Sequence, residues 1–345
     1  MAAAVSVTGC DRRAVSDGPA VVEVVSIPGE MGVTPDLGRV VLTRWGGDFS
    51  AIGVCDLQAG SVEVLQAGRK ANLRHPALSP DGAKIAFTAR GVDLSTEGLG
   101  SLHLAPTRGG EARRIGGRAT YKNPSFSPDG SRILVFAGDE RWGPVQLVEI
   151  DLGSGAETVL QSGAFEGSNK TAYDPVGKGY LVGALGPAAS LAEATSAHTL
   201  NYDTKYGLPR AFRIPREGGE PRPVAPAADV GKAASLLGVT PDGGVILNSL
   251  LEEAQFGYRA VLVTRQGEVR TLWRTPRGGD IPSGISISAD GKRLLGVTLL
   301  VDDAGNSRDI YKIAIIDPGQ GEGWRVLSEV LSSDLRATNH DLKLA

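Results

Sequence analysis

The sequence predicts an all-β fold assembled from one four-stranded unit that recurs along the chain. A tight turn followed by a short apolar strand occurs six times, and further short strands separated by Gly-rich turns come after each copy. The composition agrees, because 47 glycines and 20 prolines in 345 residues make the chain rich in turns, while 41% hydrophobic residues supply a core. We therefore expect a folded, repetitive β protein.

The repeated turn reads Ser-Pro-Asp-Gly at Ser79–Gly82 and again at Ser127–Gly130. Proline presets the first turn dihedral, aspartate bonds its own backbone and glycine accepts a positive φ. The fourth copy departs from this form, with Asp174 and Val176 where serine and aspartate stand. A turn repeated at equivalent places builds the scaffold, so we interpret it as structural. The second position of the six turns is Pro35, Pro80, Pro128, Pro175, Pro241 and Ala289.

Those positions are separated by 45, 48, 47, 66 and 48 residues, close to the roughly 40–50 residues of a propeller blade. In the third unit, the turn is followed by "RILVF", by "VQLVEIDL" from Val145 to Leu152, and by "AETVLQS" after a turn at Gly153–Gly155. Such a unit is a four-stranded antiparallel meander. The predicted fold is therefore a six-bladed β-propeller of four-stranded antiparallel meander blades.

The propeller is expected to cover residues 19–332, with residues 333–345 as a C-terminal tail. The long interval of 66 residues places an insertion at about 186–209 in the fourth blade, where "AASLAEATSAHTL" predicts a short helix. Two segments are alternatives for closing the ring beside the last blade: Pro19–Glu30 and "WRVLSEV" near the C terminus. Closure of either kind removes exposed sheet edges.

Turns of this form before apolar strands, together with outer strands such as "GGEARRI" and "GGEPRPV", resemble the TolB-like propeller repeat. The resemblance extends from about Pro19 to Val330. It implies a propeller outside the cytoplasm, but not TolB itself, because the N-terminal α/β domain of TolB has no counterpart in these residues. The Gly-His and Trp-Asp dipeptides of another propeller class do not occur in the sequence.

A second pattern lies at the start of the chain. "SVTGCDRR" has the form of a lipobox, in which small residues precede a cysteine that is lipidated, here Cys10. The preceding "MAAAVSVTG" lacks the basic residues and the apolar core of about 7–15 residues of a complete signal. We interpret residues 1–18 as a truncated signal-like segment and tether, with an unstructured tail as the alternative. Lipidation predicts membrane attachment on the periplasmic or extracellular face of a bacterial envelope.

Charge and cysteine content exclude several classes. A net charge of −3 does not indicate a nucleic-acid-binding protein. Cys10 and Cys55 form no CxxC pair, and the four histidines show no metal-ligand spacing, so we predict neither a metal nor a cofactor. Cys55 falls in a predicted strand and is expected to be a packed apolar side chain.

We place the candidate binding site on the face opposite the repeated turns, where the loops are longer and more varied. Basic residues in the blade-to-blade connections and polar residues on the inner strands there predict attraction of an anionic ligand or a carboxyl-bearing peptide. Ordinary solvated loop charges, and tryptophans that cap blade ends, are the alternatives. The candidate residues are Trp45, Arg69, Lys70, Arg74, His75, Tyr121, Lys122, Asn123, Trp142, Lys170, Arg274 and Arg277.

The sequence therefore predicts a non-catalytic binding or scaffold propeller that recognises a protein segment, a peptide or an anionic envelope ligand at the channel mouth. No catalytic residue is assigned, because no nucleophile or paired acid and base is marked by a motif. The alternative is a propeller hydrolase or lyase that acts on an anionic substrate in the same funnel. The identity of the ligand and the oligomeric state stay open.

Overall fold

The protein is described by a computed structural model, which covers residues 31–46, 49–67, 71–91, 100–138, 145–176, 179–186, 208–231, 233–251, 257–274, 282–287, 293–301, 307–316, 324–331 and 336–344. These residues form strands β1 to β24 and one four-residue helix, α2 (Ala227–Val230). The predicted all-β fold is confirmed. Across these ranges, no helix has the length and apolar character that crossing a membrane requires.

The first sheet contains nine strands. Its order is β1 (Met31–Val33), β2 (Arg39–Gly46), β3 (Phe49–Asp56), β4 (Ser61–Gln66), β24 (Arg336–Leu344), β8 (Gly110–Ile115), β7 (Ser101–Pro106), β6 (Lys84–Gly91) and β5 (Ala71–Leu78). The strands β1–β4 and β5–β8 are two antiparallel meanders, and β24 joins their outer edges.

The second sheet contains seven strands because one strand is shared. Its order is β15 (Arg222–Pro223), β14 (Leu208–Ile214), β13 (Tyr180–Gly186), β12 (Glu157–Tyr173), β11 (Val145–Asp151), β10 (Arg132–Gly138) and β9 (Thr120–Phe126). The 17-residue β12 pairs with β11 through its first half and with β13 through its second half. It is thus the outer strand of one meander and the inner strand of the next.

The remaining two sheets are separate four-stranded antiparallel meanders, as the repeat predicts. One is β16 (Ala234–Val239), β17 (Val245–Leu251), β18 (Gly257–Val263) and β19 (Val269–Arg274). The other is β20 (Pro282–Ile287), β21 (Arg293–Val301), β22 (Ser307–Ile316) and β23 (Trp324–Leu331).

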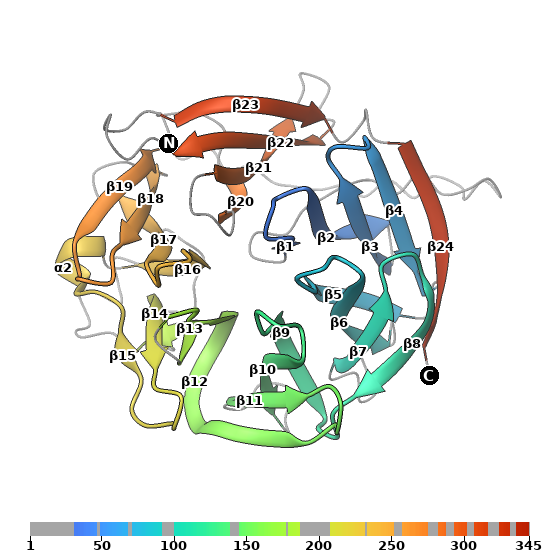
Figure 1. Cartoon of the computed structure of the whole chain (residues 1–345), viewed down its shortest axis with the longest axis horizontal. Helices are drawn as coiled ribbons and strands as arrows, with labels where there is room; N and C mark the ends of the chain where they lie inside the picture. Colours follow the sequence, from blue (N-terminus) through green and yellow to red (C-terminus); the bar gives the residue numbers. More distant parts are fainter. Residues whose placement is uncertain are drawn as a thin grey trace, which may run out of the picture.

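The sheets are arranged radially around one axis (Figure 1). The strands β1, β5, β9, the second half of β12, β16 and β20 succeed one another around the centre, and β1 contacts both β5 and β20. Between neighbouring meanders lie apolar clusters: Ile52 packs with Leu73 and Phe87, and Leu295 of β21 packs with Leu37 and Val40. This last cluster closes the ring through side-chain packing between the last sheet and the first.

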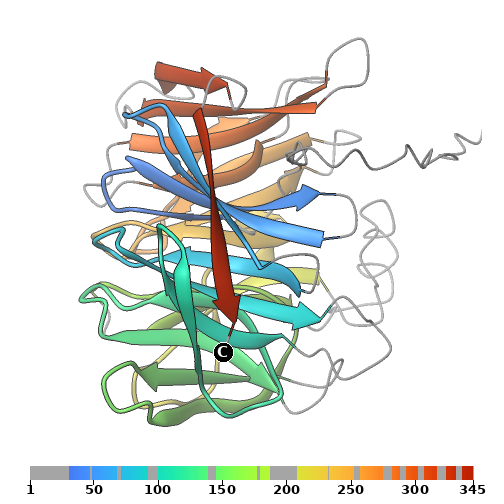
Figure 2. The ribbon, with the colours of Figure 1, turned by 90° about the vertical axis from the view of Figure 1, so that its right-hand side faces the viewer.

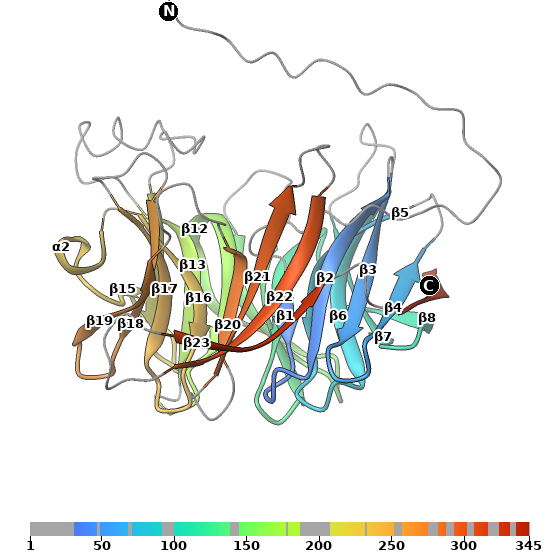
Figure 3. The same ribbon diagram turned by 90° about the horizontal axis from the view of Figure 1, so that it is seen from above.

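The repeated turns that fall within the described residues lie together at one end of the ring, at the lower edge of Figure 3. In the third copy, the Ser127 hydroxyl donates to Asp129 Oδ1 (2.6 Å) and accepts the Arg132 N–H (2.9 Å). Gly130 has a φ of 70°, a left-handed conformation that glycine adopts without strain. A bond from Leu152 N to Ser131 O (2.9 Å) ties the turn to the next turn of its own sheet. The turn therefore has the structural role predicted for it.

The fourth turn departs from the repeat in sequence, and its described residues, 174–176 and 179, make contacts of their own. Asp174 stands in the serine position and accepts the Val176 N–H at 3.1 Å. Its carboxylate also pairs with the Arg213 guanidinium of β14, while the Asp174 side chain is only 1% exposed. Arg213 donates in addition to the Gly243 carbonyl of the following turn (3.2 Å). One partly buried ion pair thus replaces the hydroxyl–carboxylate pair of the other described copies and links two neighbouring turns.

Three expectations about the ends and the insertion meet different outcomes. Residues 336–344 were expected to be part of a tail, but they form β24 along the outer edges of β4 and β8 (Figure 2). Strand β23 occupies the outer position of the last sheet. Pro19–Glu30, Cys10 and the helix expected in the insertion lie outside the described residues. Cys55 is 1% exposed, which confirms its assignment as a packed side chain.

Candidate functional site

Apart from Tyr121, which is described below, five of the predicted site residues lie on three of the innermost strands. Arg74 and His75 are on β5, Lys122 and Asn123 on β9, and Lys170 on β12. All five side chains are partly exposed. We call these residues the inner-strand group. Their recurrence on successive inner strands follows from the repeat.

His75 and Asn123 share an unusual backbone conformation. Their φ angles are 50° and 51°, and each residue precedes a proline, Pro76 or Pro124. The pairing register shifts at both places, so each inner strand is bulged there. A positive φ is strained for a side chain other than glycine, although asparagine and histidine tolerate it better than most. The strain is therefore concentrated at matching positions of two neighbouring inner strands.

Neighbouring side chains satisfy the carbonyl groups of these bulges. The Thr171 hydroxyl donates to Asn123 O (2.7 Å), and the Thr88 hydroxyl donates to Arg74 O (3.2 Å). The Lys170 ammonium donates to Leu237 O on β16 (2.5 Å). These polar groups near the centre of the ring are thus engaged in hydrogen bonds, several of which join adjacent inner strands.

Burial shifts the protonation equilibrium of the two lysines in the inner-strand group. Desolvation lowers the pKa of Lys122 below its ordinary value, and it lowers the pKa of Lys170 to about 8. Because the charged form of Lys170 is destabilised by burial, an anion that approached it would strengthen its protonation. The two lysines can therefore supply positive charge to a ligand at neutral pH.

Tyr121 occupies a different place from the one predicted. It is 1% exposed and belongs to the apolar cluster between β6–β7 and β10–β11. Its hydroxyl donates to Glu157 Oε1 (2.6 Å) and accepts the Arg118 N–H (2.9 Å). Burial, the largest cause, and the bond to Glu157 raise the pKa of the phenol. Tyr121 is a packing and hydrogen-bonding group between sheets, because its side chain has no surface to offer a ligand.

The other predicted site residues are described in part or not at all. Trp45 lies on β2 and Arg274 ends β19, but only their backbone is described. The residues outside the described ranges are Arg69, Lys70, Trp142 and Arg277.

The structure also contains a polar cleft at the end of the ring that carries the repeated turns. It has a volume of about 300 Å³ and lies between the turns that follow β9, β12 and β14. We call it the turn-face cleft. Its lining residues are Ser127, Pro128, Asp129, Arg132, Glu149, Tyr173, Asp174, Pro175, Gly179, Tyr180 and Arg216.

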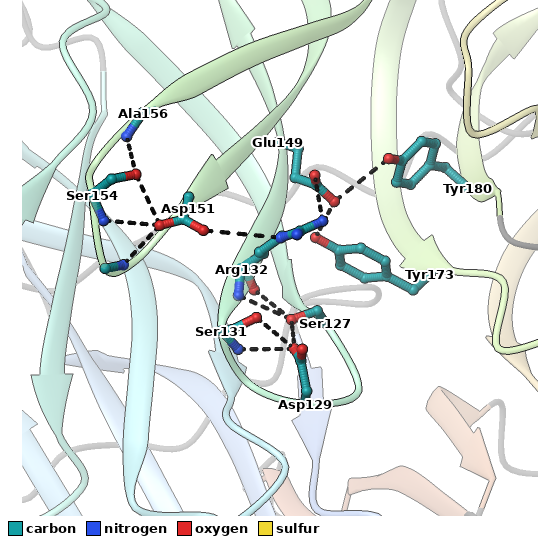
Figure 4. Close-up of polar contacts among 11 residues, drawn as sticks. Ser127, Asp129, Ser131, Arg132, Glu149, Asp151, Ser154, Ala156, Tyr173 and Tyr180 are labelled. Atoms are coloured by element: carbon teal, nitrogen blue, oxygen red, sulfur yellow. Dashed lines mark hydrogen bonds and ion pairs between the residues drawn. The ribbon is translucent and has the colours of Figure 1, made fainter.

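Glu149 is the centre of the polar contacts in this cleft (Figure 4). Its carboxylate accepts from Arg132 Nη1 (3.2 Å), the Tyr173 hydroxyl (3.1 Å) and, at a longer 3.5 Å, the Tyr180 hydroxyl. The two phenol rings meet edge to face with centroids 5.8 Å apart. Burial, and then the Glu149 charge, raise the pKa of both tyrosines. Both phenols therefore stay protonated and act as donors.

Most charges that line the cleft are already engaged. Glu149 is paired with Arg132, Asp174 with Arg213, and the Asp129 carboxylate accepts from Ser127 and from the Ser131 N–H (3.0 Å). Arg216 differs: its side chain is exposed, and no hydrogen bond or ion pair engages its guanidinium within the described part of the chain. The charged group that remains available to a ligand is therefore the positive guanidinium of Arg216.

Sequence reasoning missed this cleft because it located the site on the opposite face. Arg132 and Glu149 sit at facing ends of β10 and β11, 17 residues apart, and the tyrosines come from the following unit. The available signal was that Tyr173 and Tyr180 flank the fourth turn, whose sequence departs from the repeat. In the described ranges, no group of three His, Cys, Asp or Glu side chains is placed to hold a metal ion.

A closed set of radial antiparallel sheets defines the chain as a β-propeller, and comparison with solved structures shows the fold of TolB-like propellers. TolB from Acinetobacter baumannii has a TM-score of 0.58 and 18% identity, covering 88% of this chain and 65% of its own. A protein assigned as TolB from Agrobacterium tumefaciens has a TM-score of 0.54 and 20% identity, covering 79% and 88%. An oligogalacturonate lyase in complex with manganese has a TM-score of 0.52 and 16% identity, covering 85% and 76%.

These similarities extend to the fold alone, because the identities are low. The chain spans slightly less than two thirds of the Acinetobacter TolB. No protein-family model matches the sequence. No curated protein matches it either.

Proposed function

We propose that the chain is a six-bladed propeller of the bacterial cell envelope that binds a protein segment, a peptide or another anionic ligand without catalysing a reaction. The six innermost strands and the sharing of β12 and β24 between meanders support the blade count. A propeller presents ligand-binding groups at the ends of a rigid ring, where loops and strand ends meet. The proposal extends to a location outside the cytoplasm and to lipid attachment at Cys10.

The observation that carries the proposal is the uncommitted guanidinium of Arg216 at the rim of the turn-face cleft. A guanidinium binds a carboxylate through two parallel hydrogen bonds, which gives orientation as well as affinity. Tyr173, whose side chain is partly exposed, supplies aromatic surface beside it, and aromatic side chains with a polar edge are common anchors in binding sites. The cleft therefore suits a carboxylate group of a peptide or an acidic sugar.

The inner-strand group is the second location for the same function, at the place the sequence predicts. Lys122 and Lys170 are its partly buried cations, and a ligand that reached them would gain from low local dielectric. The two locations call for different variants, so one titration series distinguishes them.

The test is binding of a panel of acidic peptides and oligogalacturonates to the unaltered chain, measured by calorimetry. Arg216→Ala is expected to weaken the best ligand at least tenfold, because the ion pair is lost. Arg265→Ala is the matched control, since Arg265 is also an exposed arginine, in the turn between β18 and β19. If Lys170→Ala weakens binding and Arg216→Ala does not, the ligand binds at the inner-strand group. Failure of the whole panel to bind would refute the proposal.

Catalysis is the second candidate function, and one observation favours it. The Tyr173 hydroxyl lies 3.1 Å from the Glu149 carboxylate inside the cleft, within reach for proton transfer. Because its pKa is raised, the Tyr173 phenol is protonated at neutral pH and does not serve as a base. Tyr173→Phe distinguishes the two functions: a hydrolase or lyase would lose turnover of a bound ligand while keeping affinity, whereas a binding protein shows no turnover before or after the change.

A further inference from the structure

Strand β24 is held by two sheets at once. Residues Arg336–Asp341 pair in parallel with Ser61–Gln66 of β4, and Leu342–Leu344 pair in parallel with Gly110–Ala112 of β8. All other strand pairs in the described ranges are antiparallel. Without β24, β4 and β8 would present the free backbone groups of two sheet edges, which are templates for another strand.

Alternate side chains of β24 face the ring. Leu342 is 6% exposed and joins the apolar cluster that contains Ile52 and Phe87, and Leu344 packs against that cluster. The His340 ring is paired with the Glu63 carboxylate of β4. The strand period of two therefore turns a His-x-Leu-x-Leu pattern inward.

The turn between β7 and β8 fits closely around this strand. Gly109 has a φ of 79°, and a Cβ added there would lie 2.7 Å from the His340 Cβ. The acceptor surface thus has three elements: the carboxylate of Glu63, a glycine turn that admits the backbone, and an apolar recess for the leucine at position 342. We call it the strand-acceptor groove between β4 and β8.

The attachment of β24 to this groove is slight in side-chain terms. Arg336, Thr338, Asn339, Asp341 and Lys343 are all exposed, so backbone bonds, two leucines and the His340–Glu63 pair hold the strand. Parallel pairs are somewhat less stable than antiparallel ones. Because β24 is part of the same chain, it meets the groove at a high effective concentration.

We propose that the strand-acceptor groove is a docking site for an extended segment of a partner protein that carries a His-x-Leu-x-Leu pattern, and that β24 is its tethered competitor. The bound segment would add a parallel strand between β4 and β8, with its imidazole on Glu63 and its first leucine in the recess. Main-chain bonds give such a complex affinity, and the alternate side chains give specificity. This groove involves none of the residues of the turn-face cleft.

The experiment measures binding of a fluorescent peptide with the sequence of residues 336–345 to full-length protein. Leu342→Asp in the chain should release β24, because the carboxylate cannot enter the apolar recess. The released protein is expected to bind the peptide at least tenfold more tightly than the unaltered chain does. Thr338→Ala is the matched control, since this exposed side chain of β24 should leave peptide binding as weak as in the unaltered chain. A peptide carrying the same Leu-to-Asp change should not bind.

A folded Leu342→Asp protein, verified by its circular dichroism and thermal transition, that binds no peptide would overturn the proposal. Equal binding of the two peptides would do the same. Hydrogen exchange on the unaltered chain keeps the test decisive if the variant does not fold: excess peptide should accelerate exchange in residues 336–344, and an unchanged rate contradicts the proposal. A dimer of the unaltered chain that Leu342→Asp abolishes would make a second copy the occupant and would overturn the assignment to a partner protein.

Discussion

The Tyr121 hydroxyl donates a 2.6 Å hydrogen bond to Oε1 of Glu157, and so joins the third inner strand to a strand that begins at the outer edge of the same meander. Arg118 completes the network through its ion pair with Glu157 at 3.1 Å. Burial opposes ionisation of Glu157, but the bonds from Tyr121, Gly117 and Arg118 outweigh it and lower the pKa of this carboxyl. The network holds an ionised carboxylate between two sheets.

Tyr121→Phe is expected to reduce the free energy of unfolding by about 1–3 kcal/mol, because a partly buried carboxylate loses a donor and the Arg118 N–H loses its acceptor. Urea denaturation measures the change. Tyr180→Phe is the matched control, since its hydroxyl lies 3.5 Å from Glu149 and should matter less. Equal losses for the two variants would contradict the role assigned to the Tyr121 bond.

The Ser127 hydroxyl is the main cause of an acidic carboxyl in the third turn. Its bond, followed by those from Ser131, lowers the pKa of Asp129 to about 2. Since this folded-state pKa lies below the ordinary aspartate value of 3.8, the contribution to stability is present above pH 4 and is lost as the pH falls toward 2. Ser127→Ala should raise the Asp129 pKa in a carbon-detected NMR titration. Ser154→Ala, whose hydroxyl contacts Asp151, should leave it unchanged.

Substitutions of Asn123 test whether its backbone conformation is strained. With a φ of 51°, Asn123→Val should cost about 1–3 kcal/mol of stability, because a β-branched side chain is disfavoured at positive φ. Asn123→Gly should be close to neutral, since glycine adopts this conformation freely. Thermal melts of both variants provide the comparison, and similar stability for valine and glycine would be evidence against strain.

The lowered pKa of Lys170 predicts that the protein becomes more stable in mildly alkaline solution. Its folded-state pKa of about 8 lies below the ordinary lysine value of 10.5, so the unfolded chain binds more protons between these pH values and stability rises across that interval. Lys170→Met should remove up to about 3 kcal/mol of this rise, as a shift of this size implies. Unfolding curves at pH 7 and pH 10 for the two proteins give the difference. A rise that is the same in both would show that Lys170 is not its source.

The fold was predictable because local sequence specifies a meander. Proline, aspartate and glycine in a fixed order define each turn, and alternating apolar residues define the strands around it, as in Ser127–Gly130 with β10 and β11. The placement of Arg74, His75, Lys122, Asn123 and Lys170 on innermost strands followed from the same register. Because the same local pattern recurs along the chain, it predicts the overall architecture.

The turn-face cleft and the role of Tyr121 depend on contacts between meanders. Glu149 meets Tyr173 and Tyr180 only because β12 passes from one meander into the next. Tyr121 is buried because the adjacent sheet covers it. Local sequence does not indicate that Glu149 meets these tyrosines or that the adjacent sheet covers Tyr121.

By itself, the sequence determined the all-β meanders and the structural role of the repeated turn, since both depend on residues within a few positions of one another. Only the tertiary structure decided that residues 336–344 form a strand. Their sequence is polar and weakly patterned, and they become β24 because β4 and β8, more than 220 residues earlier, offer two open edges and a recess for Leu342. Such pairing is set by the edges available in the folded ring, which local propensity does not encode.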